Sequence, residues 1–394
     1  MWSDKTDDMG NWVWLPRTGG KLKACMLLVI MLAFCTNVWA FEDPMESTAI
    51  NSSLASNSLL LDITFSGDRI IAVGEMGHII YSDDNGQSWQ QADVPVRVLL
   101  TSVVFPGGGQ AGWAAGHAGI VLFSSDAGKT WVKQLDGRQV NQILVDAYKT
   151  AVSEKKDHLG SASKEERGRL QAELEELEFQ LSDAMGFAEE GPSRALFDIC
   201  FRNELEGYAV GPFGMIIQTL DGGKTWTSEA PSIDNPDASH FMAITFIDNT
   251  LFLAGEKGFI SRSFDGGKSW ERLETPYNGT FFGLTGDASG IMLVGLRGNA
   301  VVSFDRGKSW STVKTEQKTT MSSAMIISDG RILVSQYAKS LMVSNNARTR
   351  LSALSWVAGK SVSSFVLGHD GSLITVGVGG VTRIIDPDFS AKVN

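Results

Sequence analysis

The chain has 394 residues, of which 43% are hydrophobic, 20% are charged and 42 are glycine. This composition is typical of a folded, turn-rich globular protein and excludes a disordered chain. The formal net charge of −11 argues against a nucleic-acid-binding surface, which must be basic, so we expect no nucleic-acid partner.

Residues 1–40 have the pattern of an export signal. Three basic residues precede an apolar run from Ala24 to Phe34, and Val38 and Ala40 lie where a signal peptidase reads small side chains; the basic residues are Arg17, Lys21 and Lys23. The run of about 11 residues is shorter than the ~20 needed to span a bilayer, so a permanent anchor is the less favoured alternative. We predict a signal peptide over 1–40, cleaved after about Ala40, and a periplasmic protein.

A short motif, SxDxGx(S/T)W, recurs five times along the remaining chain, with Thr replacing the first Ser in the third copy. The copies are Ser82 to Trp89, Ser124 to Trp131, Thr219 to Trp226, Ser263 to Trp270 and Ser303 to Trp310. The Asp can accept hydrogen bonds from backbone N–H groups that follow it, and the Gly of the motif can adopt a positive φ. The Trp can pack on a neighbouring sheet. We therefore predict structural Asp-box corners, formed by Asp84, Asp126, Asp221, Asp265 and Asp305 with Trp89, Trp131, Trp226, Trp270 and Trp310.

Each copy belongs to a longer unit that reads strand, turn, strand, Asp-box corner, strand. The first residue of the preceding GxxG turn recurs at Gly74, Gly116, Gly211, Gly255, Gly295, Ser335 and Gly377, in steps of 42, 95, 44, 40, 40 and 42 residues. A period of about 40 residues is that of a propeller blade. The sequence predicts an all-β, seven-bladed β-propeller with four-stranded antiparallel blades over 41–394. We expect residues from about Met45 to Ala55 to complete the seventh blade.

The long step of 95 residues marks an insertion, Arg138 to Glu190, between blades 2 and 3. Its period is helical, with one apolar stripe at Val140, Ile143, Ala147 and Ala151 and another at Leu170, Leu174, Leu177 and Leu181. Ser163 and Glu166 have the spacing of a capping box at the start of the second helix. We predict an inserted α-helical hairpin over 138–190, and two interpretations stay open: a self-contained decoration or a docking arm.

The alternating strand directions place the GxxG turns, the connections between blades and the hairpin on one face, and the Asp-box corners on the other. Loops that converge on the channel of a propeller are the usual place for binding. On that face we predict a partner-binding set consisting of Arg97, Arg194, Arg297, Tyr337 and Lys257.

Catalytic groups are not apparent. A sialidase-type hydrolase needs an arginine cluster, a tyrosine nucleophile with an acidic partner, and an acid. Glu75 and Glu256 belong to blades nearly opposite each other, and Tyr337 has no obvious partner. The histidines lack metal-ligand spacing, and Cys200, the one cysteine beyond the leader, reads as a buried strand residue. We expect no catalytic residue, no metal and no cofactor.

The repeated boxes and the opening stretch LLLDITFSGDRIIAVGEMGHIIYSDDNGQSW resemble the photosystem II stability/assembly factor family of Asp-box (BNR-type) propellers. The resemblance implies a non-enzymatic propeller that helps to assemble a membrane complex, in the thylakoid lumen of photosynthetic members. In non-photosynthetic bacteria it implies a periplasmic partner of membrane machinery, including transporters of the RND class. The hairpin and the ordinary bacterial leader depart from the photosynthetic pattern.

These observations predict an exported, monomeric, non-enzymatic propeller that is peripheral to the membrane. Its expected partner is a membrane protein complex or transporter, whose assembly or function it assists. The alternative is a sialidase-like glycoside hydrolase or a carbohydrate-binding propeller.

Overall fold

The computed structural model describes residues 42–337, 341–354 and 361–385. The chain divides into two compact units, Met1–Asp43 and Pro44–Asn394, and every element named below belongs to the second. The predicted signal peptide lies outside the described residues.

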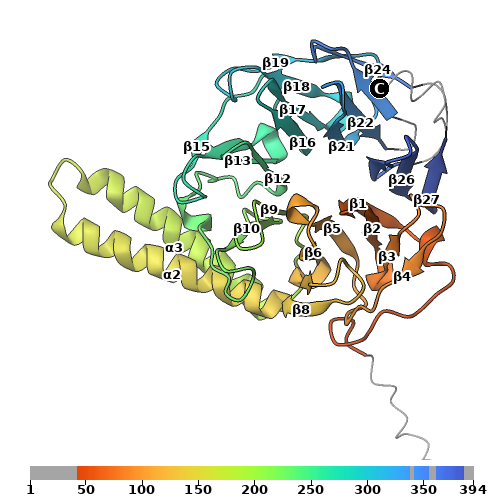
Figure 1. The fold of residues 1–394 in the computed structure, drawn as a ribbon. Coiled ribbons are helices and arrows are strands. Elements are labelled where there is room, and N and C mark those ends of the chain that lie inside the picture. Colours follow the sequence, from red (N-terminus) through yellow and green to blue (C-terminus); the bar gives the residue numbers. More distant parts are fainter. Residues whose placement is uncertain (1–41, 338–340, 355–360, 386–394) are drawn as a thin grey trace, which may run out of the picture. The chain divides into compact units, whose positions relative to one another are not determined.

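The described residues form seven β-sheets, and each sheet runs outward from the strand nearest the common centre (Figure 1). Four sheets have four antiparallel strands. The first two are β1 (Leu60–Ser66), β2 (Arg69–Gly74), β3 (Ile79–Ser82) and β4 (Gln90–Gln91), then β5 (Leu100–Val104), β6 (Gly112–Gly116), β7 (Val121–Ser124) and β8 (Val132–Leu135). The other two are β12 (Phe241–Ile247), β13 (Thr250–Gly255), β14 (Ile260–Ser263) and β15 (Glu271–Arg272), then β16 (Phe281–Asp287), β17 (Gly290–Gly295), β18 (Ala300–Ser303) and β19 (Ser311–Thr312).

The remaining three sheets depart from the predicted four strands. Two have three strands, namely β9 (Asp198–Phe201), β10 (Gly207–Val210) and β11 (Ile216–Thr219), and β25 (Ser364–Leu367), β26 (Leu373–Gly377) and β27 (Gly380–Ile384). One has five, β21 (Met321–Ile326), β22 (Ile332–Gln336), β23 (Leu341–Ser344), β24 (Arg350–Ala353) and the short parallel β20 (Lys314–Thr315). In the third sheet, Thr227 pairs with Gln218 only as an isolated bridge. The chain then enters the 3₁₀ turn η5 (Ala230–Ser232), where Pro231 has no N–H to continue a ladder.

The innermost strands of successive sheets contact one another in chain order, and β25 contacts β1; these strands are β1, β5, β9, β12, β16, β21 and β25. Figure 1 shows these inner strands gathered around a common centre, with the outer strands at the periphery. Side chains between the sheets are fully buried, as where the Trp113 and Phe201 rings stack with centroids 3.8 Å apart. This arrangement is that of a β-propeller.

The segment before β1 does not complete the last sheet, as we expected it to. Ala49 N–H donates to Val94 O, Gln91 Nε2 donates to Ile50 O, and Met45 packs in the core between the first two sheets. Only the 3₁₀ turn η1 (Ala55–Asn57) reaches β27. The prediction was wrong because the apolar and polar groups of 44–52 find partners along the outer edges of the first and second sheets.

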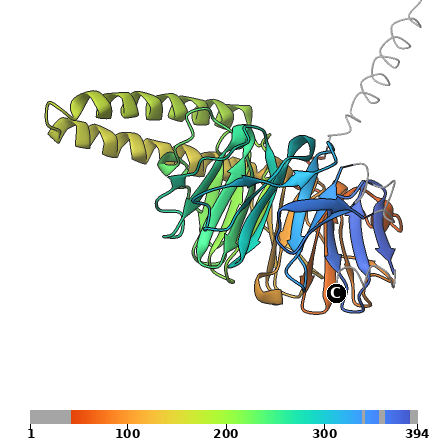
Figure 2. The same ribbon diagram turned by 90° about the horizontal axis from the view of Figure 1, so that it is seen from above.

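Two helices, α2 (Gly137–Ser161) and α3 (Arg167–Glu190), occupy the insertion and project outward from the ring of sheets (Figure 2). A complete capping box starts α2, because Asp136 accepts from the backbone N–H of Gln139 and Gln139 Oε1 accepts from Asp136 N–H. At the start of α3, Glu166 is itself the N-cap residue, and its carboxylate accepts from Ser163 Oγ (2.8 Å) and Ser163 N (3.2 Å). The N–H of Glu166 donates to Ser163 O rather than to the serine hydroxyl. The expected capping box is therefore incomplete.

The buried face of α2 differs from the predicted stripe. Val140 and Leu144 pack into the core of the second and third sheets, and Val152 packs on Leu174 and Leu177 of α3. Of the predicted stripe, Ile143 packs partly on the first of these clusters and Ala151 partly on the second; both residues, with Ala147, are half-buried and also line an open groove. The helix has two neighbours, the propeller at its start and α3 further along, so its buried positions shift from one face to another.

Candidate functional site

The Asp-box corners repeat one set of hydrogen bonds. In the fourth corner, Ser263 Oγ donates to Asp265 Oδ1 (2.8 Å) and accepts from Gly267 N (2.8 Å), and Asp265 Oδ1 accepts from Ser269 N (3.0 Å). Trp270 Nε1 donates to Gly267 O (2.9 Å). The hydroxyl of Ser269, followed by its N–H, holds the pKa of Asp265 at about 2. The same hydroxyl and carboxylate bonds recur at Asp84, Asp126, Asp221 and Asp305.

The third corner differs from the others at its tryptophan. Trp89, Trp131 and Trp310, like Trp270, each donate the indole N–H to the Gly carbonyl three residues earlier. Trp226 is 8% exposed, and its indole N–H has no partner within the described residues. Here Gln134, from β8 of the second sheet, donates to Gly222 O (3.0 Å). This corner is the one beside the helices.

The channel at the centre of the propeller is lined by two half-buried carboxylates, Asp62 and Asp198. Asp62 accepts from Val103 N (2.9 Å), and Asp198 accepts from Ile244 N (2.9 Å), so each joins its own sheet to the next. Ser102 Oγ lies 2.9 Å from Asp198 and 3.3 Å from Asp62. Burial raises the pKa of Asp198 to about 6 and also raises the pKa of Asp62. The channel measures about 310 Å³.

The face of the GxxG turns displays five side chains from equivalent positions. Each middle residue has a left-handed backbone, with φ between 53° and 58°; they are Met76, Ala118, Phe213, Lys257 and Arg297. An L side chain in this region costs about 1 kcal/mol relative to glycine. Four of the five side chains are exposed, Ala118 being the exception.

The predicted partner-binding residues occupy five different turns or connections of this face. Lys257 and Arg297 are exposed, and Tyr337 is 60% exposed; the turns of Arg297 and Tyr337 share one neighbour, since Thr320 Oγ1 accepts from Arg297 N and Thr320 O accepts from Tyr337 N. Lys257 Nζ donates to Asp237 O (3.2 Å). Arg97 is half-buried and donates through Nε to Thr48 O (3.2 Å).

Arg194 lies beneath the helices and is 9% exposed. Its Nη2 donates to Asn141 Oδ1 of α2 (2.6 Å), and its guanidinium lies 4.4 Å from the ring centre of Phe187 in α3. Burial lowers its pKa to about 10. The structure thus uses Arg194 to hold both helices against the start of the third sheet.

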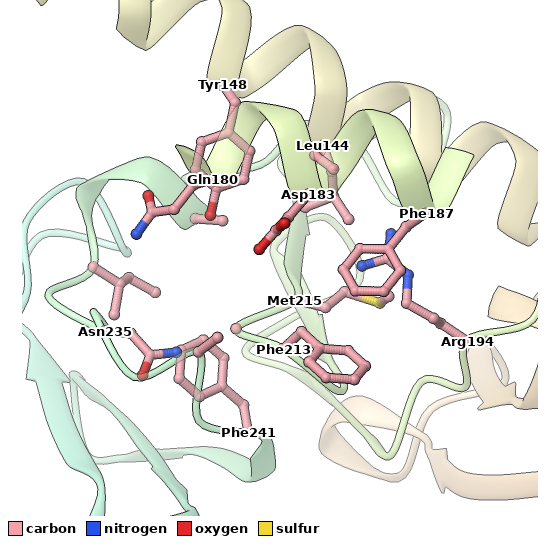
Figure 3. A pocket seen from close by; sticks show the side chains of 15 residues that line it. Leu144, Tyr148, Gln180, Asp183, Phe187, Arg194, Phe213, Met215, Asn235 and Phe241 are labelled. Atoms are coloured by element: carbon pink, nitrogen blue, oxygen red, sulfur yellow. The ribbon is translucent and has the colours of Figure 1, made fainter. Parts of the chain in front are cut away.

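A small pocket of about 60 Å³ separates the helices from the third and fourth sheets (Figure 3). Tyr148 of α2 and Gln180 and Asp183 of α3 face it from one side, and Phe213 and Asn235 face it from the other. Burial raises the pKa of Tyr148 to about 12. The pocket therefore has polar groups from the helices and from the propeller within an otherwise apolar wall.

A larger groove of about 1170 Å³ adjoins this pocket. Gln180, Ile233 and Asn235 line both the pocket and the groove. We call it the arm groove: its one wall is α2 and α3, and its other wall is the connection 226–236. A concave surface of this size with walls from two separate elements is a candidate binding site.

Two further observations bear on the class of protein. Among the described residues, no group of three or more His, Cys, Asp or Glu side chains is placed to hold a metal ion. Within the same residues, no helix has the length and apolar character needed to cross a membrane.

The radial sheets and their repeated corners define an Asp-box β-propeller. The chain belongs to the family described as photosynthesis system II assembly factor YCF48, whose model matches residues 43–154 and 189–318. The match omits 155–188, which comprise the end of α2 and most of α3.

The chain is similar to two curated relatives over short stretches. It is 37% identical over 78 residues to the photosystem II assembly lipoprotein Ycf48 of Synechococcus sp. (strain CC9902), which is 19% of this chain and 23% of that protein. It is 28% identical over 106 residues to the chloroplastic photosystem II stability/assembly factor HCF136 of Oryza sativa subsp. japonica, 25% of this chain and 26% of that protein. The chain thus matches about a quarter of the length of each.

Solved structures match over most of both chains and show the fold. YCF48 bound to D1 peptide has a TM-score of 0.55 at 14% identity, with 84% of this chain and 95% of that one covered. YCF48 from Cyanidioschyzon merolae gives 0.56 at 14% identity, with 87% and 99% covered. The WD40 propeller domain of Doa1 gives 0.57 at 9% identity, with 88% and 98% covered.

Sequence reasoning missed the channel carboxylates and the arm groove. Asp62 and Asp198 occupy the same place in the LLLDI and LFDI runs, and a polar residue at a repeated position of buried strands was an available signal. The groove had no comparable signal, because it depends on how the helices pack on the propeller.

Proposed function

We propose that this chain is a seven-bladed propeller that binds a segment of a membrane protein and assists the assembly or function of the complex to which that protein belongs. The observation that carries the proposal is the family match over residues 43–154 and 189–318. A related fold has been solved with a peptide of the D1 protein bound. Seven sheets whose inner strands contact in order support the blade count.

We propose further that the protein acts outside the cytoplasm, after cleavage of the leader near Ala40, and is peripheral to the membrane and monomeric. The leader pattern supports export. In a non-photosynthetic bacterium, a transporter of the RND class is the partner that this proposal favours.

The placement of the carboxylates on the turn face supports binding rather than hydrolysis. Glu75 Oε1 accepts from Leu59 N (2.8 Å), and Glu256 Oε2 accepts from His240 N (3.2 Å). Each therefore fixes the strand connection of its own sheet, and neither is paired with the other across the channel as a glycosidase would require.

Co-purification tests the proposal. The full chain, tagged at its C-terminus, is expressed in its native host, cross-linked in cells and purified from solubilised membranes. We expect one membrane complex to be enriched over a tagged control propeller and to retain the chain in the reciprocal purification. Recovery of the chain without any membrane protein would overturn the proposal.

Two simpler measurements test the remaining parts. The N-terminal sequence of the purified protein should begin near residue 41, and the protein should fractionate with the periplasm. If the protein hydrolyses sialosides and Tyr337→Phe abolishes this activity, the protein is a glycoside hydrolase and the proposed binding function is wrong.

A further inference from the structure

The arm groove has an apolar strip on α2 that the fold covers only in part, since Ile143 packs partly on the core of the second and third sheets and Ala151 on the cluster of Val152, Leu174 and Leu177. Ile143, Ala147 and Ala151 recur at four-residue intervals on α2 and line the groove in a half-buried state. Pro231 adds apolar surface on the opposite wall, where Trp226 is 8% exposed and belongs to the core of the second and third sheets. A contiguous strip between two elements is a typical docking surface.

Carboxylates surround this strip. Five of them line the groove and make no ion pair in the described part of the chain: Asp146, Glu154, Glu176, Glu229 and Asp234. Three accept a hydrogen bond only from a neutral glutamine side chain. Of the basic residues in the lining, Lys155 is already 2.7 Å from Glu173. The groove therefore carries uncompensated negative charge.

The two walls bring like charges toward each other. Glu229 lies on the connection and Glu154 on α2; burial raises the pKa of Glu229, the hydrogen bond from Gln218 and the charge of Lys268 partly offset this, and the charge of Glu154 raises it further. A positive group placed between the walls would relieve this repulsion.

We propose that the arm groove binds a basic amphipathic segment of a protein partner. The apolar side of the segment rests on the Ile143, Ala147 and Ala151 strip, and its Lys or Arg side chains pair with the surrounding carboxylates. This inference rests on the proposed function, because that function makes the occupant of the groove a protein.

The dimensions agree with a segment of this kind. The α2 residues of the lining run from Ile143 to His158, about 22 Å at the rise of an α-helix. This length matches about four helical turns, and the volume of about 1170 Å³ is large for a small-molecule site.

Much of the helical wall lies outside the stretch that this chain shares with its family. Residues 155–188 are not matched by the family model and supply Glu173, Glu176, Leu177 and Gln180 to the groove. The α3 side of the groove therefore lies outside the matched stretch, whereas the Ile143, Ala147 and Ala151 strip lies within it.

A designed peptide tests the groove directly. The probe is a fluorescein-labelled amphipathic peptide of Lys, Leu and Ala, about 14 residues long to match the lining. Its affinity for the purified protein is measured by fluorescence anisotropy. We expect saturable binding that weakens as salt rises, and at least tenfold weaker binding when Glu replaces Lys or Ser replaces Leu.

A matched pair of triple variants locates the binding. The groove variant Glu154→Gln, Glu176→Gln, Asp234→Asn should raise the Kd about tenfold. The control variant Asp157→Asn, Glu175→Gln, Glu189→Gln removes the same charge from exposed positions on the helices that do not line the groove, and should change the Kd less than twofold. Hydrogen exchange should show protection by the peptide at 143–158 and 226–236.

Equal effects of the two triples, or protection elsewhere, would overturn the inference. The groove variant is also taken through the co-purification described above, where we expect reduced recovery of the membrane complex. A complex retained equally by wild type and groove variant would contradict the groove while leaving the proposed function intact. A peptide bound in the groove, with no complex recovered by wild type, would contradict the proposed function alone.

Discussion

The Asp-box face and the arm groove are built in opposite ways. On the Asp-box face, five corners repeat the same Ser or Thr, Asp and Gly bonds, and each carboxylate is already saturated by its own turn. In the arm groove, five carboxylates have no ion pair within the described part of the chain and lie beside apolar side chains that are only half-buried. Saturated, repeated groups stabilise the fold, whereas unsaturated, single-copy groups are available to a partner.

Replacing a buried corner tryptophan should have the largest effect on stability. Trp131 is 4% exposed, whereas Trp89 is half-buried in the equivalent corner. Trp131→Ala should lower the free energy of unfolding by about 3–5 kcal/mol, and Trp89→Ala by less, because less surface leaves water there. Denaturant titration measures the free energy of unfolding of both variants. Equal losses of stability would show that the burial of the tryptophan does not determine how much each corner contributes.

Asp198 of the channel should make the stability of the protein depend on pH. The folded-state pKa of Asp198, about 6, lies above its ordinary value of 3.8, so the contribution of this group is greatest below pH 4 and is lost as the pH rises to 6. Relative to Asp198→Asn, wild type should lose about 2 kcal/mol between pH 4 and 7.

Asp305→Asn is the control for this titration, because the folded-state pKa of Asp305 is about 2 and the group stays ionised over the whole range. Parallel stability curves for wild type and Asp198→Asn would contradict the assignment.

The opening hydroxyl of a corner should matter through its hydrogen bond rather than through its size. Ser124 Oγ accepts from the buried N–H of Gly128 (2.9 Å), and Thr219 makes the equivalent bond in the third corner. Ser124→Ala should cost about 1–2 kcal/mol, and Ser124→Thr should cost under about 0.5 kcal/mol. Thermal unfolding distinguishes them; a destabilising Thr would mean that the corners are not interchangeable.

Relieving strain on the turn face should have the smallest effect and the opposite sign. Lys257 has φ of 53°. Lys257→Gly should raise the free energy of unfolding by about 0.5–1 kcal/mol, while Lys257→Ala, which keeps the strain, should not. If both variants behave alike, the left-handed backbone carries no cost at this position.

The propeller fold and the two helices were predictable because they depend on local periods. The Asp, Gly and Trp of each box, and the leucines of α3, recur at spacings that identify a corner or a helix without knowledge of the rest of the chain. Residues 44–52 were placed wrongly because their partners, such as Val94 and Gln91, are chosen by edge packing.

Less of the candidate site than of the fold could be predicted from the sequence. Lys257 and Arg297 could be assigned to exposed turns from the GxxG spacing alone, since each turn repeats. Arg194 could not be assigned to the underside of α3, because Asn141 and Phe187 reach it only once the helices fold back on the third sheet. The five-residue partner-binding set remains a prediction.

The five left-handed turn residues have a practical consequence for engineering. Their backbone is fixed by the turn, so the side chain at Met76, Phe213, Lys257 or Arg297 can be exchanged without redirecting the chain. A library that varies only these positions would sample new surface chemistries on an unchanged scaffold, which makes this rim suited to directed evolution of binders.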